Sequence, residues 1–234
     1  MIIQIQPWIS WTEIKEIFKV VKSTFITEGK ATIRFEEETK KLTNSRYAMA
    51  YANGTLALYA ALKSLNIGQG DEVITAANTF VATVGAITEI GAKPVFVDCD
   101  DTFCMNVNEI EKKITKKTKA IVPVHFTGYM VYMPKLMKIA KKYNLYVVED
   151  ACQSILGEIN KKKAGTWGDF GAFSLHPLKN INVWSDGGVI TTNKLSYYKK
   201  LLLLRNHGLI NRNTVKINGY NSRLDTFQAV VGNW

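Results

Sequence analysis

The chain has 234 residues, 47% of them hydrophobic, so it is long enough for one large α/β domain or two small ones, and its composition argues against disorder. It has no run of 18 uncharged apolar residues, and its start, "MIIQIQPWISWTEIKE", lacks the regions of a signal peptide, so we expect neither a membrane span nor secretion. The net charge of +10 lies largely in basic runs, which are typical of a solvated face and would also suit an anionic substrate. Aromatic residues are not interleaved with these runs, so nucleic-acid binding is the least favoured function.

The first 45 residues predict a helical segment. Apolar residues at helical spacing predict a helix over 11–25, with Thr12 as a candidate N-cap. The stretch "RFEEETKKL" predicts a second short helix over 34–42. We therefore expect an N-terminal helical segment over residues 1–45, followed by a large domain over residues 46–234.

From residue 47 onward, short apolar runs alternate with helical patterns. The apolar runs predict strands over 47–52, 72–76, 93–98, 119–125, 145–150, 169–176 and 187–192. The helical patterns lie over 54–67, 78–91, 106–114, 133–144 and 194–208. This alternation predicts an α/β fold with a largely parallel, doubly wound sheet, and the continuous apolar strands are typical of a sheet covered on both faces.

In such folds a ligand binds beyond the carboxyl ends of the strands. The segment Asn53-Gly54-Thr55 follows a strand and opens a helix, whose free N–H groups and dipole suit a phosphate. Asp150 and Ser174 end two further strands. The sequence has neither a Walker loop nor GxGxxG, so it lacks the fingerprints of nucleotide-triphosphate and dinucleotide sites.

Lys179 stands in "HPLKNINVW", among apolar residues, and is either a structural residue or a nucleophilic amine. A nucleophilic lysine needs desolvation or nearby positive charge, because a free lysine is protonated at neutral pH. A lysine, a strand-end carboxylate and a phosphate cradle together suit pyridoxal 5'-phosphate. We expect no metal site, since the acidic group Asp98, Asp100 and Asp101 has no further converging ligand.

Motifs at consistent spacing run through nearly the whole chain. Among them are "PWISWTEIKEI", "YAMAYANGTLALYAAL", "GDEVITAANTFVATVGAI", "KAIVPVHFTG", "VVEDACQS", "GDFGAFSLHPLKNINVWSDGGVITT", "RNHG" and "GYNSRLDTFQA". In these motifs the chain resembles the DegT/DnrJ/StrS family of pyridoxal-phosphate-dependent sugar aminotransferases. The resemblance implies the large domain of a fold-type I transferase, with a mixed seven-stranded sheet between helices.

The resemblance also implies a role for each matched residue. Lys179 is the Schiff-base lysine and proton carrier, Asp150 pairs with the pyridine nitrogen and Gln153 reaches the ring hydroxyl. Phe80 stands where the family has an aromatic ring that stacks on the cofactor. The phosphate is held by Gly54, Thr55 and Ser174.

Two later residues are implied to act across a homodimer with a shared active site. Asn221 reaches the phosphate of the partner subunit's cofactor, and Arg223 contacts a substrate carboxylate across the dimer. Two motifs depart from the family pattern, because "NGT" stands where "SGT" is common and Ser185 stands where glycine is usual. Family members continue into a C-terminal small domain, which we expect to be absent from this chain.

The function implied is transfer of an amino group from an amino acid, with glutamate expected, to a nucleotide-linked keto-sugar in amino-sugar or polysaccharide biosynthesis. One alternative is a truncated, non-catalytic or regulatory relative that still binds the cofactor. Another is a deoxysugar dehydratase, against which Lys179 argues because those relatives replace the lysine with histidine. Three cysteines without CxxC spacing, Cys99, Cys104 and Cys152, fit a reduced, cytoplasmic setting.

Overall fold

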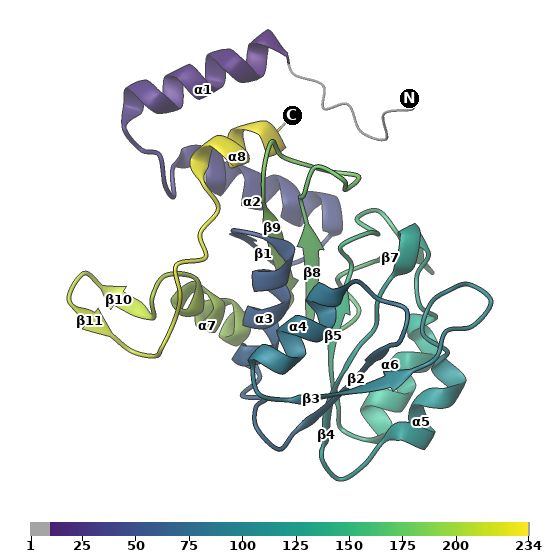
Figure 1. The fold of residues 1–234 in the computed structure, drawn as a ribbon. Coiled ribbons are helices and arrows are strands. Elements are labelled where there is room, and N and C mark those ends of the chain that lie inside the picture. The colour runs from purple at the N-terminus through teal and green to yellow at the C-terminus, as the bar shows by residue number, and fades with distance from the viewer. Residues whose placement is uncertain (1–9, 234) are drawn as a thin grey trace.

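The centre of the molecule is a seven-stranded sheet with the strand order β1-β9-β8-β5-β4-β2-β3 (Figure 1). The computed structural model describes residues 10–233. The strands are β1 (Tyr47–Tyr51), β2 (Glu72–Ala76), β3 (Lys93–Val97), β4 (Thr118–Val122), β5 (Tyr146–Asp150), β8 (Phe170–Ser174) and β9 (Gly188–Thr192). Neighbouring strands are parallel except where β9 pairs antiparallel with β1 and with β8. The predicted α/β fold with a mostly parallel, mixed seven-stranded sheet is confirmed.

Helices cover both faces of this sheet. They are α1 (Trp11–Ser23), α2 (Lys30–Thr43), α3 (Gly54–Ser64), α4 (Val81–Glu89), α5 (Ile110–Lys113), α6 (Met133–Lys142), α7 (Leu195–Arg205) and α8 (Thr226–Gly232). Buried side chains form one core with α3, α4 and α7 and a second core with α2, α5, α6 and α8. Successive strand residues enter opposite cores, as Val147 and Val148 of β5 do, because side chains alternate across a sheet. The result is three layers, α/β/α.

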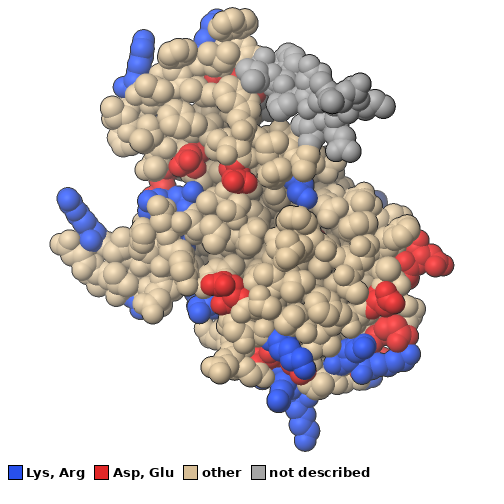
Figure 2. Space-filling model, viewed as in Figure 1, with Lys and Arg blue, Asp and Glu red and all other residues tan. Residues whose placement is uncertain are grey.

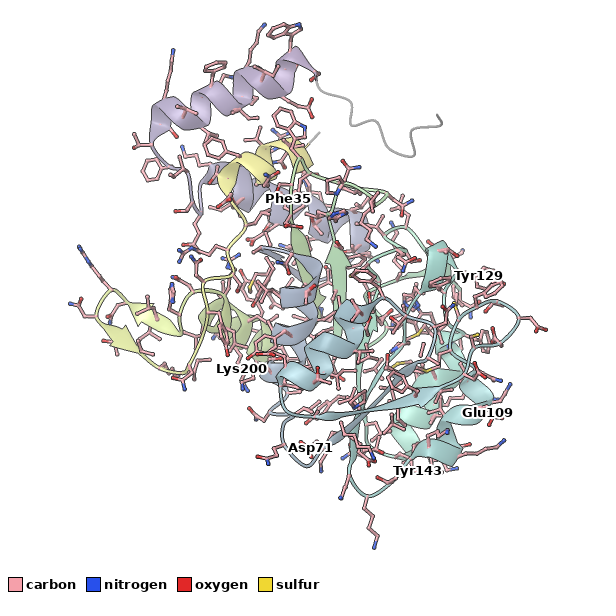
Figure 3. All side chains as sticks on the ribbon, in the orientation of Figure 1. Phe35, Asp71, Glu109, Tyr129, Tyr143 and Lys200 are labelled. Atoms are coloured by element: carbon pink, nitrogen blue, oxygen red, sulfur yellow. The ribbon has the colours of Figure 1, made fainter. Side chains whose placement is uncertain are left out.

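The N-terminal helices and the C-terminal helix pack together at one end of the sheet (Figure 1). Phe35 of α2 is buried beneath α8, where a Cβ added to Gly232 would lie 2.7 Å from its ring (Figure 3). The N–H of Thr226, the first residue of α8, donates to the carbonyl of Ile26 at 3.1 Å. The N-terminal and C-terminal helices, about 200 residues apart in sequence, therefore stabilise each other by direct contact.

Several element boundaries differ from the predictions. The N-cap of α1 is Ser10 rather than Thr12, since the N–H of Glu13 donates to Ser10 Oγ at 3.3 Å and the N–H of Ser10 donates to the Glu13 carboxylate at 2.6 Å. Helix α2 begins at Lys30, four residues before the predicted start. The helix predicted over 106–114 is a 3₁₀ turn at Val107–Glu109 followed by the single turn α5, because the side chain of Asn106 caps a tight turn.

Two short hairpins were not predicted. They are β6 (Glu158–Ile159) with β7 (Lys162–Lys163), and β10 (Leu209–Asn211) with β11 (Thr214–Val215), which projects from the body in Figure 1. The first hairpin turns through Asn160 and Lys161, both with positive φ, as a two-residue hairpin loop requires. Strands of two or three residues are too short to show an alternating pattern.

Charged side chains of both signs lie on the face of the molecule shown in Figure 2, where Lys and Arg are interspersed with Asp and Glu. Ion pairs such as Lys142–Glu111 and Lys194–Asp169, both at 2.7 Å, join neighbouring elements at the surface. Within residues 10–233, none of the helices combines the length and the apolarity that crossing a membrane requires.

Candidate active site

A cavity of about 390 Å³ lies at the carboxyl ends of the central strands. Its walls come from four places in the chain: the start of α3 after β1, the start of α4, the end of β5 and the end of β8 with the turn that follows it. Seven of the residues proposed from the sequence line it: Gly54, Thr55, Phe80, Asp150, Gln153, Ser174 and Lys179. This is the position at which parallel α/β sheets bind ligands.

Volume alone does not select this cavity. A larger hollow of about 710 Å³ lies between α1, α2 and α8, and another of about 510 Å³ lies at the opposite ends of the strands. Neither combines a buried carboxylate with a lysine amine and the start of a long helix. The choice of the strand-end cavity therefore rests on its chemistry.

The start of α3 forms one wall of the cavity. Asn53 is the N-cap, and its side-chain oxygen accepts the N–H of Leu56 at 2.8 Å. The N–H groups of Gly54 and Thr55 belong to the first turn, where a helix offers no backbone acceptor, and both residues line the cavity. This wall presents hydrogen-bond donors and the positive end of the helix dipole, which together suit an anion.

Asp150 ends β5 and is 5% exposed. Its Oδ2 accepts the hydroxyl of Thr83 at 2.6 Å, and its Oδ1 accepts the N–H of Cys152 at 3.2 Å. The backbone of Asp150 is held as well, since its N–H donates to the carbonyl of Pro123 at 2.9 Å. The carboxylate therefore has a fixed position and keeps one free acceptor site on each oxygen.

Lys179 lies in the turn between β8 and β9, where its N–H donates to the carbonyl of His176 at 2.8 Å. The side chain is half-buried, and the ammonium makes no ion pair or hydrogen bond with any residue from 10 to 233. The predicted apolar surroundings are only partly present. Val183 is 1% exposed, whereas Leu178 is 62% exposed because it sits at the outer edge of the turn.

Phe80 and Gln153 occupy two further sides of the cavity. Phe80 is the N-cap of α4 and remains 68% exposed, so one face of its ring is open to a ligand. The side-chain oxygen of Gln153 accepts the N–H of Thr127 at 3.0 Å, which leaves its NH₂ group as the available donor. Thr127 has a positive φ of 50°, a conformation that costs a β-branched residue energy and that places this N–H.

Asn221 and Arg223 do not line this cavity. Asn221 forms an isolated bridge with Asn206, and the guanidinium of Arg223 donates to the Asn206 side chain. The segment nevertheless lies beside the start of α3, because the N–H of Ala52 donates to the carbonyl of Ser222 at 2.8 Å.

Apart from apolar residues, four side chains that line the cavity were not assigned to the site from the sequence: Thr83, Cys152, His176 and Asp186. Thr83 had a usable signal, since it follows Phe80 by three residues on a predicted helix and so shares its face. Burial of the thiol, followed by the charge of Asp150, raises the pKa of Cys152 well above its ordinary value, against a smaller lowering by Lys179. His176 is oriented through its Nδ1, which accepts the N–H of Leu178 at 3.2 Å.

Glu149, on the opposite face of β5 from Asp150, is fully buried. Its carboxylate accepts His125 Nε2 at 3.0 Å and the N–H groups of Gly165, Trp167 and Gly168 at 2.9, 2.6 and 2.8 Å. His125 also accepts the N–H of Val131 through Nδ1 at 3.3 Å, so its neutral form carries the proton on Nε2. This network fixes the end of β5 from behind the cavity.

The sequence profile of the DegT/DnrJ/EryC1/StrS aminotransferase family matches residues 7–234. A UDP-N-acetyl-3-dehydro-alpha-D-glucosamine 3-aminotransferase of Acidithiobacillus ferrooxidans is 43% identical over 216 residues, which are 92% of this chain and 58% of that protein. A pleiotropic regulatory protein of Geobacillus stearothermophilus is 39% identical over 214 residues, 91% of this chain and 58% of that protein.

Solved structures agree with this match. The structure of NtdA from Bacillus subtilis with bound cofactor PMP superposes with a TM-score of 0.88 at 33% identity and covers 100% of this chain and 56% of that one. The chain thus spans little more than half the length of the relatives it matches.

The residues of the cavity fit the pyridoxal-phosphate cofactor of this family. Gly54 lacks a Cβ where one would lie 2.8 Å from Ser174, so the first turn of α3 approaches β8 closely enough for both to touch one phosphate. Asp150 keeps free acceptor sites for a ring N–H, and Gln153 keeps its NH₂ group for a ring hydroxyl. The amine of Lys179 has no competing partner among residues 10–233.

Proposed function

Because the chain belongs to the DegT/DnrJ/EryC1/StrS aminotransferase family, we propose that it transfers an amino group from glutamate to the ketone of a nucleotide-linked sugar. Amino-sugar or polysaccharide biosynthesis would use the product. One observation carries the proposal, namely that Lys179, Asp150 and the first turn of α3 meet in one cavity. The naming of a relative as a UDP-sugar 3-aminotransferase supports the substrate class.

Pyridoxal 5'-phosphate, when bound, supplies an aldehyde that combines with amines and a protonated ring that takes up electrons. In our proposal Asp150 holds the proton on the ring nitrogen, since a fixed carboxylate favours the charged form of its partner. The amine of Lys179 would hold the aldehyde end of the bound cofactor. The same amine would take the proton from the α-carbon of glutamate and carry it within the site.

The remaining residues bind and orient. The N–H groups of Gly54 and Thr55, with the hydroxyl of Ser174, bind the phosphate, and the exposed ring of Phe80 covers one face of the pyridine ring. Gln153 donates its NH₂ group to the ring hydroxyl. Overall, glutamate and the keto-sugar would exchange an amino group for a carbonyl oxygen, giving 2-oxoglutarate and the amino-sugar, so the net reaction balances without an outside oxidant or reductant.

The proposal includes a homodimer. In it, Asn221 reaches the phosphate in the partner subunit and Arg223 contacts a substrate carboxylate across the interface. Two features support this arrangement: both residues lie outside the cavity of their own chain, and their segment is tied beside α3 through Ala52. The absence of disulfides among Cys99, Cys104 and Cys152 supports a cytoplasmic setting.

The first test is the visible spectrum of the purified chain with pyridoxal phosphate, before and after glutamate. We expect an absorbance band that disappears in Lys179→Ala, persists in the control Lys138→Ala, and shifts when glutamate is added. Lys138 suits the control because it is exposed on α6, remote from the cavity. A folded chain without a Lys179-dependent band would refute the proposed activity.

A second candidate is a regulatory relative that binds the cofactor without turnover. The specific observation in its favour is the 39% identity to a protein named as a pleiotropic regulatory protein. A band that requires Lys179 but ignores glutamate and every other amino donor would favour this candidate.

A further inference from the structure

Thr83 makes a short hydrogen bond to the carboxylate at the centre of the cavity. Its Oγ1 lies 2.6 Å from Asp150 Oδ2, and the residue is 1% exposed. Thr83 belongs to the first turn of α4, whereas Asp150 ends β5, so the bond joins two elements 67 residues apart in sequence. A bond between a hydroxyl and an ionised carboxylate is among the stronger hydrogen bonds in proteins.

The direction of this bond follows from the chemistry of its members. An ionised carboxylate only accepts hydrogen bonds, so the single hydroxyl proton of Thr83 points to Asp150. Thr79 Oγ1 lies 2.7 Å from Thr83 Oγ1, and since the Thr83 proton is already engaged, Thr79 is the donor of that pair. The result is a directional chain from Thr79 through Thr83 to Asp150.

This series of hydrogen bonds leaves one acceptor site on each carboxylate oxygen of Asp150 for a ligand. The N–H of Cys152 occupies one acceptor site on Oδ1, and Thr83 occupies one on Oδ2. With both oxygens engaged on the protein side, rotation of the carboxyl group would break one of these bonds. The remaining acceptor sites therefore keep one orientation.

We propose that Thr83 is a positioning residue for the ring nitrogen of the cofactor, acting through Asp150. Its hydroxyl holds the carboxylate so that a free acceptor site faces the ring N–H. Phe80 caps the same helix turn, so the contact to the edge of the ring and the contact to its face are both set by the start of α4. This inference rests on the proposed function, because it requires the cofactor ring to bind at Asp150.

The test measures binding of two ligands to the full chain. One is pyridoxamine phosphate, which cannot form a covalent bond with Lys179, and the other is its analogue with carbon in place of the ring nitrogen. Thr83→Val, which keeps the shape and removes the hydroxyl, should weaken binding of pyridoxamine phosphate about tenfold, the effect of losing one hydrogen bond to a charged group. The carbon analogue should lose less than about twofold, because it has no N–H for Asp150 to accept.

Two further variants separate this role from a structural one. Thr83→Ser keeps the hydroxyl and should bind pyridoxamine phosphate within about threefold of the unmodified chain. Thr88→Val makes the same substitution on the exposed side of α4, where Thr88 Oγ1 bonds only to the carbonyl of Gly85, and should change neither affinity. If Thr83→Val fails to fold, Thr79→Val removes the hydroxyl that donates to Thr83 instead. It should weaken binding of pyridoxamine phosphate, but not of the carbon analogue, about twofold to threefold.

The outcomes distinguish the inference from the function it rests on. Equal weakening of both ligands by Thr83→Val would show a general packing role and overturn the inference alone. Unchanged binding of pyridoxamine phosphate would do the same. If the unmodified chain, folded by circular dichroism, binds neither ligand, the proposed function fails together with the inference.

Discussion

Gly54 and Ser174 approach so closely that a Cβ added to Gly54 would lie 2.8 Å from the Cβ of Ser174. The sulfur of Cys152 would lie 3.2 Å from the same added atom. Ser174 is fixed in strand β8, and Cys152 is held by the turn that follows β5. A glycine at the start of α3 is therefore what lets two predicted phosphate ligands stand next to each other.

The substitution Gly54→Ala should damage both the fold and the binding site. Overfilling a packed interior typically costs about 1–3 kcal/mol, and we expect a loss of unfolding free energy in that range. Displacement of the first turn of α3 should weaken pyridoxamine phosphate binding by at least about tenfold, because its N–H donors move away from Ser174. Urea unfolding and a ligand titration measure the two effects.

Gly85→Ala is the matched control for this substitution. Gly85 lies inside helix α4, and a Cβ added there would meet no atom within 4 Å. Alanine should stabilise the chain by up to about 1 kcal/mol through its higher helix propensity. If both alanines changed stability equally, close approach would not be the reason for glycine at position 54.

The sequence predicted the elements that the hydrophobic effect determines most directly. The seven long strands were found because each is a continuous apolar run, and the doubly covered sheet follows from that pattern. The β6–β7 hairpin was missed because its two-residue strands are held by left-handed residues such as Asn160. That the sheet is mixed came only from the family resemblance, and the antiparallel direction of β9 was not predicted, because periodicity carries no strand direction.

The sequence predicted those residues of the candidate site that lie at the ends of strands. Asp150, Ser174 and Gly54 each follow or end a strand, and the fold places all three at one cavity. The spacing of Thr83 from Phe80 placed both on one helix face, but its bond to Asp150 was missed because a contact between α4 and β5 is not encoded in local spacing. The partial exposure of Lys179 was likewise unpredictable, since it depends on how the β8–β9 turn lies against solvent.

Removal of the Arg205 guanidinium should destabilise the chain strongly. Arg205 is 8% exposed and donates to Glu36 at 2.6 Å and to the carbonyl of Ala50 at 3.1 Å, joining α7, α2 and β1. Arg205→Ala leaves the largely buried Glu36 carboxylate without its cation, and such losses cost about 3–5 kcal/mol. Chemical denaturation should show this loss.

The exposed pair Lys19–Glu16 provides the contrast. Its side chains are 71% and 38% exposed, and exposed pairs contribute less than about 1 kcal/mol. Lys19→Ala should therefore leave the denaturation midpoint nearly unchanged. A loss in Arg205→Ala as small as that in Lys19→Ala would contradict a structural role for the buried pair.

Alkylation of Cys152 should be slow and should accelerate with pH. Burial raises the pKa of this thiol well above its ordinary value, so the reactive thiolate is scarce from about pH 7 to about pH 9. We expect iodoacetamide to modify Cys152 at least about tenfold more slowly than Cys99, with a rate that still rises at about pH 9. Peptide mass spectrometry over time gives both rates, and a plateau for Cys152 near neutral pH would contradict the raised pKa.

The network behind the cavity should be essential for folding. Glu149→Ala would leave the buried N–H group of Gly165 and the partly buried N–H groups of Trp167 and Gly168 without acceptors, and each such loss costs about 1–3 kcal/mol. We expect a total loss above about 3 kcal/mol, seen as a lower midpoint in thermal unfolding.

Glu149→Gln should also destabilise, because an amide NH₂ group cannot accept the backbone donors that face one of the two oxygens. Glu158→Ala removes an exposed glutamate from the β6–β7 hairpin and should stay within about 0.5 kcal/mol of the unmodified chain. The comparison isolates the buried acceptor from the loss of a negative charge. Glu149→Ala unfolding at the temperature of Glu158→Ala would mean that the N–H groups find other acceptors and that Asp150 does not depend on this network for its position.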